Sequence, residues 1–140
     1  HLNRGPEYAA SDYEREWAVA HPIREEYRQR AIAAAEAHAE GFRKAVKAGV
    51  KIASGSDLAL PDGGLLEMGM LVRCGMSEWQ AIVAATQTAA EVCCVGDDYG
   101  NVEPGKRADL VALKHNPLED IESIHRRTLV VKHGQVVVRE

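Results

Sequence analysis

The feature that most constrains the fold of this chain is a single short β-run among helices. Val50 to Ala53 form a short run that is apolar except for Lys51, whereas the sequence on either side, up to about residue 98, has the pattern of helices and turns. A lone strand cannot satisfy its own backbone donors and acceptors inside a core, and a buried parallel strand needs neighbours on both sides. The chain also begins without Met. Together these facts predict a piece of something larger.

A helix is predicted directly before this run, from Ile23 to Ala48. Apolar residues recur there at spacings of three and four, which places them on one helical face. Gly49 follows the last turn, where a glycine commonly closes a helix in the left-handed conformation. The members of the predicted face are Ile32, Ala35, Ala39, Phe42 and Val46.

Two more helices are predicted after the run. The first covers Leu65 to Cys74. The second begins at a capping box in which Ser77 caps the helix and Gln80 reaches back to it. This second helix is expected to continue to about Val95 and to end at Gly96.

Beyond residue 98 the pattern changes to short β-runs separated by turns. His133-Gly134 lies between two of these runs and predicts a hairpin. We therefore expect two domains, 1–98 and 99–140. The predicted strands are Asp109 to Leu113, Thr128 to Lys132 and Gln135 to Val138.

Composition excludes several classes of protein. Apolar residues make up 46% of the 140 residues, so a core can form, but the formal net charge is −4 and no basic stripe occurs. Nucleic acid is therefore not an expected partner. No apolar run approaches the roughly 18 residues needed to span a bilayer, and the N-terminal stretch has no apolar segment of the kind a signal peptide requires. We expect no membrane association.

The cysteines indicate a reducing, cytoplasmic location. There are three of them, at Cys74, Cys93 and Cys94. Their number is odd, the adjacent pair is poorly placed to bridge to itself, and no C-x-x-C occurs. We expect all three to be small core residues.

Asp57 is the main candidate for chemistry. It comes directly after the small residues Ser54, Gly55 and Ser56, at the end of the apolar run. In parallel α/β folds ligands bind beyond the carboxyl ends of the strands, where a carboxylate can bind a metal or act as a general base. On spacing alone, the alternative of a helix cap or a turn residue is favoured over this role.

The remaining polar residues give weaker signals. The six histidines form no H-x-H or H-E-x-x-H, and a zinc site needs three or four converging ligands. No such set can be assembled from this chain. Asp62 and Glu67 flank the loop after Asp57. Glu67 is expected to cap a helix or lie on the surface rather than contact a substrate, and the role of Asp62 stays open.

The order of these pieces resembles a known enzyme family. The stretches "AGVKIASGSD", "GLLEMGMLVRCGMSEWQAIVAATQTAAEVCCV", "GNVEPGKRADLVALKHNPLEDI" and "VVKHGQVV" are similar to the C-terminal end of a metal-dependent amidohydrolase, of the imidazolonepropionase-like and prolidase-like (Xaa-Pro dipeptidase) branch. The most specific element is Gly100 to Val111, of the form G-x-[I/V]-x-P-G-K-x-A-D-L-V, following the A-A-T-x-x-A-A helix at Ala84 to Ala90.

The resemblance implies an α/β fold, the C-terminal fragment of a (β/α)8 TIM-like barrel (its last strand and flanking helices) plus short β-strands of a small β-sandwich. Val50 to Ala53 would be the last barrel strand. Asp57 would match the family's catalytic, metal-binding Asp, which takes a proton from metal-bound water and passes it to the leaving nitrogen. Zn is the implied metal, with its other ligands outside this chain. Asp62-Gly63 stands where many relatives have His-Gly.

The resemblance therefore predicts an amidohydrolase as the full-length parent. It would hydrolyse the C–N bond of a dipeptide, an acyl-amino acid or a cyclic amide, whereas this chain alone would be inactive. A homo-oligomer is expected. Two alternatives remain. A truncated barrel exposes strand edges and apolar faces, which suits a non-catalytic, oligomerising fragment. The chain could also be a small, stand-alone α/β binding module.

Overall fold

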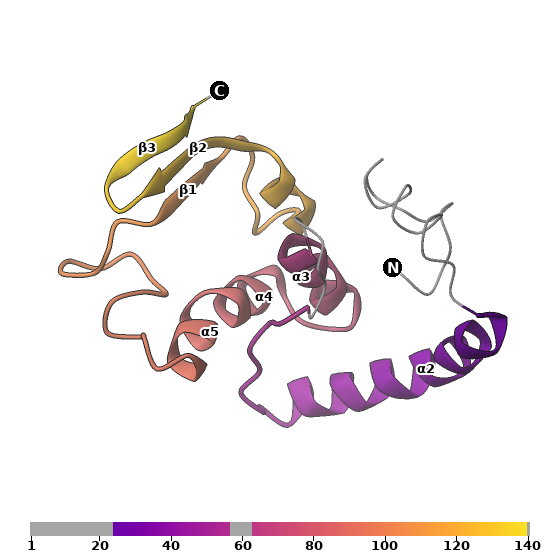
Figure 1. The fold of residues 1–140 in the computed structure, drawn as a ribbon. Helices are drawn as coiled ribbons and strands as arrows, with labels where there is room; N and C mark the ends of the chain where they lie inside the picture. The colour runs from indigo at the N-terminus through magenta and orange to yellow at the C-terminus, as the bar shows by residue number, and fades with distance from the viewer. Residues whose placement is uncertain (1–23, 57–62, 140) are drawn as a thin grey trace. The chain divides into compact units, whose positions relative to one another are not determined.

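The computed structural model describes residues 24–56 and 63–139 (Figure 1). The chain divides into two compact units, residues 1–44 and 45–140. Helix α2, Glu25–Lys47, provides the described part of the first unit and runs three residues into the second. Most of the protein's described structure therefore belongs to the second unit. The predicted domain boundary near residue 98 stays a prediction.

Helix α2 forms where the sequence predicts it. Glu25 and Glu26 lie in its first turn, where negative charge interacts favourably with the helix dipole. At the other end Gly49 has φ +73°, its N–H donates to the Val46 carbonyl at 3.0 Å, and the Val50 N–H donates to the Ala45 carbonyl at 3.0 Å. This bond pair is a Schellman motif, so the predicted glycine cap is confirmed.

Three short helices follow in the second unit: α3 (Gly63–Arg73), α4 (Glu78–Ala85) and α5 (Gln87–Val92). The predicted capping box is present, because the Gln80 N–H donates to Ser77 Oγ at 3.2 Å and the Ser77 N–H donates to Gln80 Oε1 at 2.8 Å. The single helix expected from Ser77 to Val95 is wrong in one respect: it is interrupted at Thr86. The Thr86 hydroxyl donates to the Ile82 carbonyl at 2.7 Å, a back-bond that bends helices.

The end of α5 also differs from the prediction. Cys94, not Gly96, adopts the left-handed conformation, with φ +57°. The Val95 N–H donates to the Ala90 carbonyl at 2.9 Å, which closes the helix. Cys93 and Cys94 are exposed and Cys74 is half-buried, so the expectation that all three are core residues is wrong.

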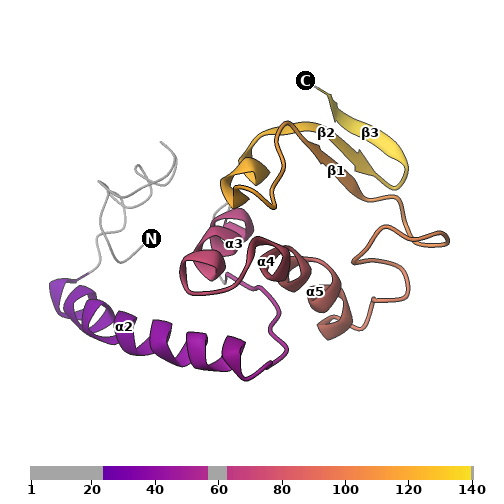
Figure 2. The same cartoon turned by 180° about the vertical axis from the view of Figure 1, so that it is seen from behind.

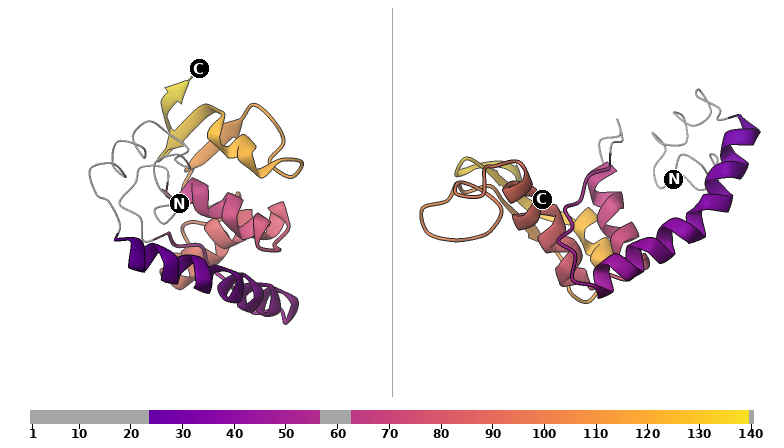
Figure 3. Two further views of the ribbon diagram at one scale, coloured as in Figure 1. Left: turned by 90° about the vertical axis from the view of Figure 1, so that its right-hand side faces the viewer. Right: turned by 90° about the horizontal axis from the view of Figure 1, so that it is seen from below.

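The core of the second unit is built from small and aliphatic side chains. Helix α3 packs against α4 and against η2, the 3-10 helix Ile121–His125, and α4 packs against α5. Figure 3 shows η2 beside α3. A Cβ added at Gly69 would lie 2.7 Å from Glu122 Oε1, which reflects this close approach. The buried apolar side chains are Leu66, Leu71, Met76, Ala81, Ala84, Ala90, Ile121 and Ile124.

The strands form one antiparallel sheet in the order β1 (Leu110–Leu113), β2 (Arg127–Lys132) and β3 (Gln135–Arg139), seen from two sides in Figures 1 and 2. The predicted strands and hairpin are confirmed. His133 and Gly134 both have positive φ, +51° and +76°, which matches the twist a two-residue hairpin turn needs. The apolar side chains of Val111, Val136, Val137 and Val138 are exposed.

The predicted strand at Val50 to Ala53 is not formed. Residues 51–56 have no strand assignment, and the three strands of the described residues pair only with one another. The physical reason is that a strand exists only through its neighbours, and no described segment offers this run an edge. Within the same described ranges, no helix is long and apolar enough to cross a membrane.

The Gly100 to Val111 element connects the helices to the sheet. Gly100 has φ +104°, and a Cβ there would lie 2.9 Å from both the Ala90 Cβ and the Gln87 Cα. Only glycine therefore fits against α5. Lys106 Nζ donates to the carbonyls of Gly96 at 2.8 Å and Tyr99 at 3.3 Å. The Gly100 to Val111 element thus contacts the Ala84 to Ala90 stretch that precedes it in the family pattern.

Candidate functional site

The segment that precedes Asp57 is held against α4 and α5. The Ser54 N–H donates to the Ala84 carbonyl at 3.0 Å, and Lys51 forms an ion pair and hydrogen bond with Glu91. This pairing holds the pKa of the Glu91 carboxyl below its ordinary value. Asp57 itself and Asp62 lie outside the described residues.

An open pocket lies where this segment leads into Asp57. Its volume is about 560 Å³, within the range of roughly 300 to 1,000 Å³ that small-molecule sites occupy. It combines hydroxyl groups, an apolar wall and one charged side chain. The lining residues are Ser54, Gly55, Ser56, Gly64, Leu65, Met68, Ala85 and Arg127.

Arg127 is the residue that sequence reasoning missed. It stands at the first position of β2, yet it lines the pocket together with Ser54 and Ser56, more than seventy positions earlier in the sequence. Its side chain is exposed and has no hydrogen bond or ion pair with another residue of the described part. The basic pair Arg126-Arg127 before a strand was the only local signal, and it does not distinguish a site residue from a solvated one.

Glu67 lies in the interior of α3, at its fifth position, and is half-buried. The expectation that it caps the helix is therefore wrong, whereas its side chain remains partly on the surface. Burial raises the pKa of its carboxyl above the ordinary value of 4.5, because removal from water disfavours the charged form. Glu67 does not belong to the lining of the pocket described above.

The described residues do not fit a complete metal centre. No group of three or more His, Cys, Asp or Glu side chains comes together among them, whereas a zinc site needs three or four protein ligands. Of the histidines in this part of the chain, His125 lies 3.6 Å from Glu122 and His133 lies 3.8 Å from Asp109. Each faces a single carboxylate.

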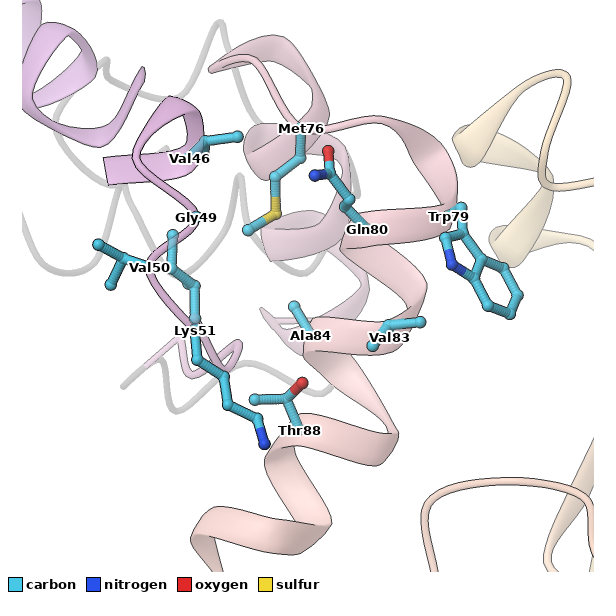
Figure 4. Close-up of a pocket in the computed structure, with 11 residues that line it drawn as sticks. Val46, Gly49, Val50, Lys51, Met76, Trp79, Gln80, Val83, Ala84 and Thr88 are labelled. Carbon is cyan, nitrogen blue, oxygen red and sulfur yellow. The ribbon is translucent and has the colours of Figure 1, made fainter. Parts of the chain in front are cut away.

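A second groove lies between residues 46–52 and helix α4. In Figure 4, Met76, Ala84 and Thr88 point toward the strip that contains Val50 and Lys51. The groove has a volume of about 220 Å³. Its lining is largely apolar and includes the exposed Val50 and Trp79. Lys51, the one charged side chain among the described residues that line it, is already paired with Glu91. This groove offers packing surface rather than acid–base chemistry.

Comparisons with known proteins agree with one another. Residues 14–137 match the model of the amidohydrolase family. Ochratoxinase from Aspergillus niger is 42% identical over 94 residues, which cover 64% of this chain and 19% of the relative. The chain therefore spans about a fifth of the length of that curated relative.

Solved structures of the same kind also match. A Xaa-Pro dipeptidase with bound methionine in its active site is 36% identical with a TM-score of 0.72, and the match covers 81% of this chain and 29% of the other. A. niger ochratoxinase gives 36% identity and a TM-score of 0.70, covering 77% of this chain and 26% of the other. The fold of this chain thus occurs within these larger enzymes.

Proposed function

Because the chain belongs to the amidohydrolase family, we propose that it is the C-terminal part of a metal-dependent hydrolase that cleaves an amide or peptide C–N bond. Residues 51–56 would form the last strand of a (β/α)8 barrel once neighbouring strands are present. The sheet of β1, β2 and β3 would belong to a small β-sandwich. The observation on which the proposal mainly rests is the family match over residues 14–137.

The names of the relatives support a narrower reading of the substrate. One solved relative is a Xaa-Pro dipeptidase with bound methionine in its active site, and another is a putative prolidase from Bifidobacterium longum, 35% identical with a TM-score of 0.67 over 72% of this chain and 26% of the other. We infer a small substrate with an amide bond: a dipeptide, an acyl-amino acid or a cyclic amide.

We assign Asp57 as the chain's contribution to the catalytic centre, both as a ligand of a divalent metal, Zn, and as the base that accepts a proton from water. The pocket supports this assignment, because Ser56 lines it and is bonded directly to Asp57. Since the described residues supply no set of three ligands, the other ligands would come from the remainder of the enzyme. The isolated chain is then expected to be inactive.

The test compares Asp57→Asn with a matched control in the complete enzyme that contains this chain. General acid–base groups contribute typically about 10²- to 10⁴-fold in rate, so Asp57→Asn should lower kcat on dipeptides and N-acyl amino acids by about that factor. Asp97→Asn, an exposed position at a turn, should leave kcat unchanged. Metal analysis accompanies the assay. Full activity in metal-loaded Asp57→Asn enzyme would refute the assignment, and stoichiometric zinc in the isolated chain would refute the incomplete ligand set.

A second candidate is a non-catalytic module that oligomerises. It is favoured by the exposed apolar side chains of Val111, Val136, Val137 and Val138, which lie on both faces of the sheet, because exposed apolar surface can mark an interaction site. Light scattering after size-exclusion chromatography decides it. A homo-oligomer at micromolar concentration supports this candidate, and a clean monomer argues against it.

A further inference from the structure

Helix α5 ends on two free thiols that stand on adjacent residues. Cys93 and Cys94 are both exposed, whereas the third cysteine, Cys74, is half-buried. Neither of the two lines the open pocket or the groove described above. Within the described residues their sulfur atoms have one weak contact, in which Cys94 Sγ lies 4.0 Å from the Val92 carbonyl oxygen. Two sulfur atoms are therefore available to a ligand at one place on the surface of this unit.

The pair is poorly suited to a disulfide bond between its own two members. Consecutive Cα atoms are about 3.8 Å apart across a trans peptide bond, whereas disulfides usually join Cα atoms about 4.4–6.8 Å apart through an S–S bond of about 2.05 Å. An atom inserted between the two sulfurs relaxes this constraint. Two bonds of about 2.3 Å, the length of a zinc–sulfur bond, allow the sulfurs to be as much as about 4.6 Å apart. Adjacent cysteines thus favour chelation of a third atom over direct oxidation.

The surroundings of the pair indicate which atom fits. Thiolates select soft, sulfur-seeking centres. A structural zinc ion needs three or four protein ligands, and no group of three or more His, Cys, Asp or Glu side chains comes together in residues 24–56 and 63–139. A trivalent organoarsenical, R–As=O, needs only two sulfurs, because its third bond is to its own organic group. Val92 and Val95, which flank the pair in the sequence, are exposed and offer apolar contact to such a group.

We propose that Cys93 and Cys94 form a dithiol site that binds one trivalent organoarsenical through both sulfur atoms. The arsenic–oxygen double bond breaks, two As–S bonds form, and the two thiol protons leave with the oxygen as one molecule of water. Arsenic stays trivalent, so neither an oxidant nor a reductant takes part. The adduct is uncharged, which suits the end of a helix, where the free carbonyls carry partial negative charge. The site does not depend on the proposed hydrolase activity.

Binding of phenylarsine oxide to the complete enzyme tests the site. Intact-protein mass spectrometry after gel filtration counts the arsenic atoms retained by each chain, with the thiols kept reduced by a phosphine. A second, linked contact commonly raises affinity by about 10²- to 10⁴-fold. Cys93→Ser and Cys94→Ser should therefore each weaken binding by about 10²-fold or more and retain one arsenic fewer than the wild type. Ethane-1,2-dithiol should remove this arsenic from the wild type, whereas an equal concentration of 2-mercaptoethanol should not.

Cys74→Ser is the matched control, because it removes a thiol of the same unit that has no cysteine beside it in the sequence. It should retain as much arsenic as the wild type, and circular dichroism should show that all variants are folded. Cysteines elsewhere in the enzyme bind the reagent equally in every variant, so the differences carry the result.

Four outcomes would overturn the site. The first is equal arsenic retention by the wild type, Cys93→Ser and Cys94→Ser. The second is an equal loss of arsenic in Cys74→Ser. The third is a folded wild type in which an aromatic disulfide reagent labels neither Cys93 nor Cys94, because the pair would then be covered in the complete enzyme. The fourth is equimolar Zn²⁺ that is held by these two residues and blocks the arsenical, because other ligands would then complete a metal site there.

Discussion

Two segments of the second unit differ in how firmly hydrogen bonds and packing contacts hold them in place. The joint, residues 96–109 between α5 and β1, is held by several contacts: Gly100 fits against α5, Lys106 donates to two carbonyls, and Asp109 accepts from the turn of the hairpin. One of its buried atoms, Asn101 Oδ1, has no hydrogen-bond partner among the described residues. The approach segment, residues 50–56, contacts α4 through the Ser54 N–H and α5 through the Lys51–Glu91 ion pair, and the side chain of Val50 is 56% exposed. The difference teaches that this chain itself supplies the contacts that hold the joint. Its described residues do not supply the three or more ligands that a metal site needs.

The largest expected effect lies in the joint, at Gly100. Gly100→Ala combines a left-handed φ of +104° with a Cβ 2.9 Å from Ala90 Cβ and Gln87 Cα. The left-handed conformation costs an L-residue roughly 1–2 kcal/mol, and overpacking adds typically about 1–3 kcal/mol. We expect the free energy of unfolding to fall by the sum, about 2–5 kcal/mol, in urea titrations.

Gly105→Ala is the control for Gly100→Ala. Gly105 also has a left-handed φ, +93°, but nothing lies within 4 Å of an added Cβ. Its substitution should therefore cost only the conformational part, about 1–2 kcal/mol. Equal losses at the two glycines would mean that the contact with α5 does not hold the joint together.

A smaller effect is expected at Lys106. Its side chain is only 16% exposed, and its ammonium group satisfies two carbonyls, so Lys106→Met leaves both acceptors without their donor. A hydrogen bond to a charged group contributes about 1.5–3 kcal/mol to stability. The loss is smaller here because water can reach part of the site and replace the missing donor. We expect a loss of about 1–2 kcal/mol in the same urea titrations.

Lys44→Met provides the comparison for Lys106. Lys44 pairs with Glu40 on the surface of α2 and is 74% exposed, and exposed pairs four positions apart on a helix contribute about 0.3–0.5 kcal/mol. If the two lysines proved equally important, burial of Lys106 would not be what gives the joint its stability.

The contrast between these regions also marks how far the sequence could predict the fold. Gly49 and the Ser77–Gln80 box were found because their signals are local: a cap depends on residues a few positions away. The hairpin at His133-Gly134 was found for the same reason. The strand at Val50 to Ala53 was predicted wrongly because a strand depends on partners that its own residues do not specify.

The candidate site shows the same limit of prediction from local sequence. Asp57 could be singled out from its position after Ser54 to Ser56, together with a family resemblance. Arg127 could not, because only the tertiary fold brings the start of β2 to the pocket beside Ser56. Thr86 and Cys94 were missed for a different reason: helix propensity and periodicity do not describe a threonine back-bond or a left-handed cysteine.

The smallest effects concern two carboxylates that acid titration can compare: Asp109 in the joint, and Glu91 on α5, which pairs with Lys51 of the approach segment. The N–H of His133 donates to Asp109 Oδ1 at 2.7 Å and Lys132 donates to the same carboxylate, so the pKa of Asp109 lies below its ordinary value of 3.8. Glu91, beside the approach segment, has a lowered pKa chiefly through Lys51. A carboxyl whose pKa is lowered on folding contributes stability that is present above its unfolded pKa and is lost as the pH falls through its folded pKa. Both contributions should therefore disappear on acidification below the ordinary pKa values.

Asp109→Asn should flatten the acid dependence of stability more than Glu91→Gln does. Asp109 is 22% exposed and has a backbone and a side-chain donor, whereas Glu91 is 36% exposed and its main partner, Lys51, is 69% exposed. Exposed pairs are weak because water and salt screen them. The measurement is the unfolding midpoint from pH 6 down to pH 2, combined with exchange of the His133 amide hydrogen, which should be faster in Asp109→Asn and unchanged in Glu91→Gln. A larger acid effect from Glu91→Gln would reverse the comparison. The ion pair of the approach segment would then contribute more stability than the Asp109 interactions of the joint.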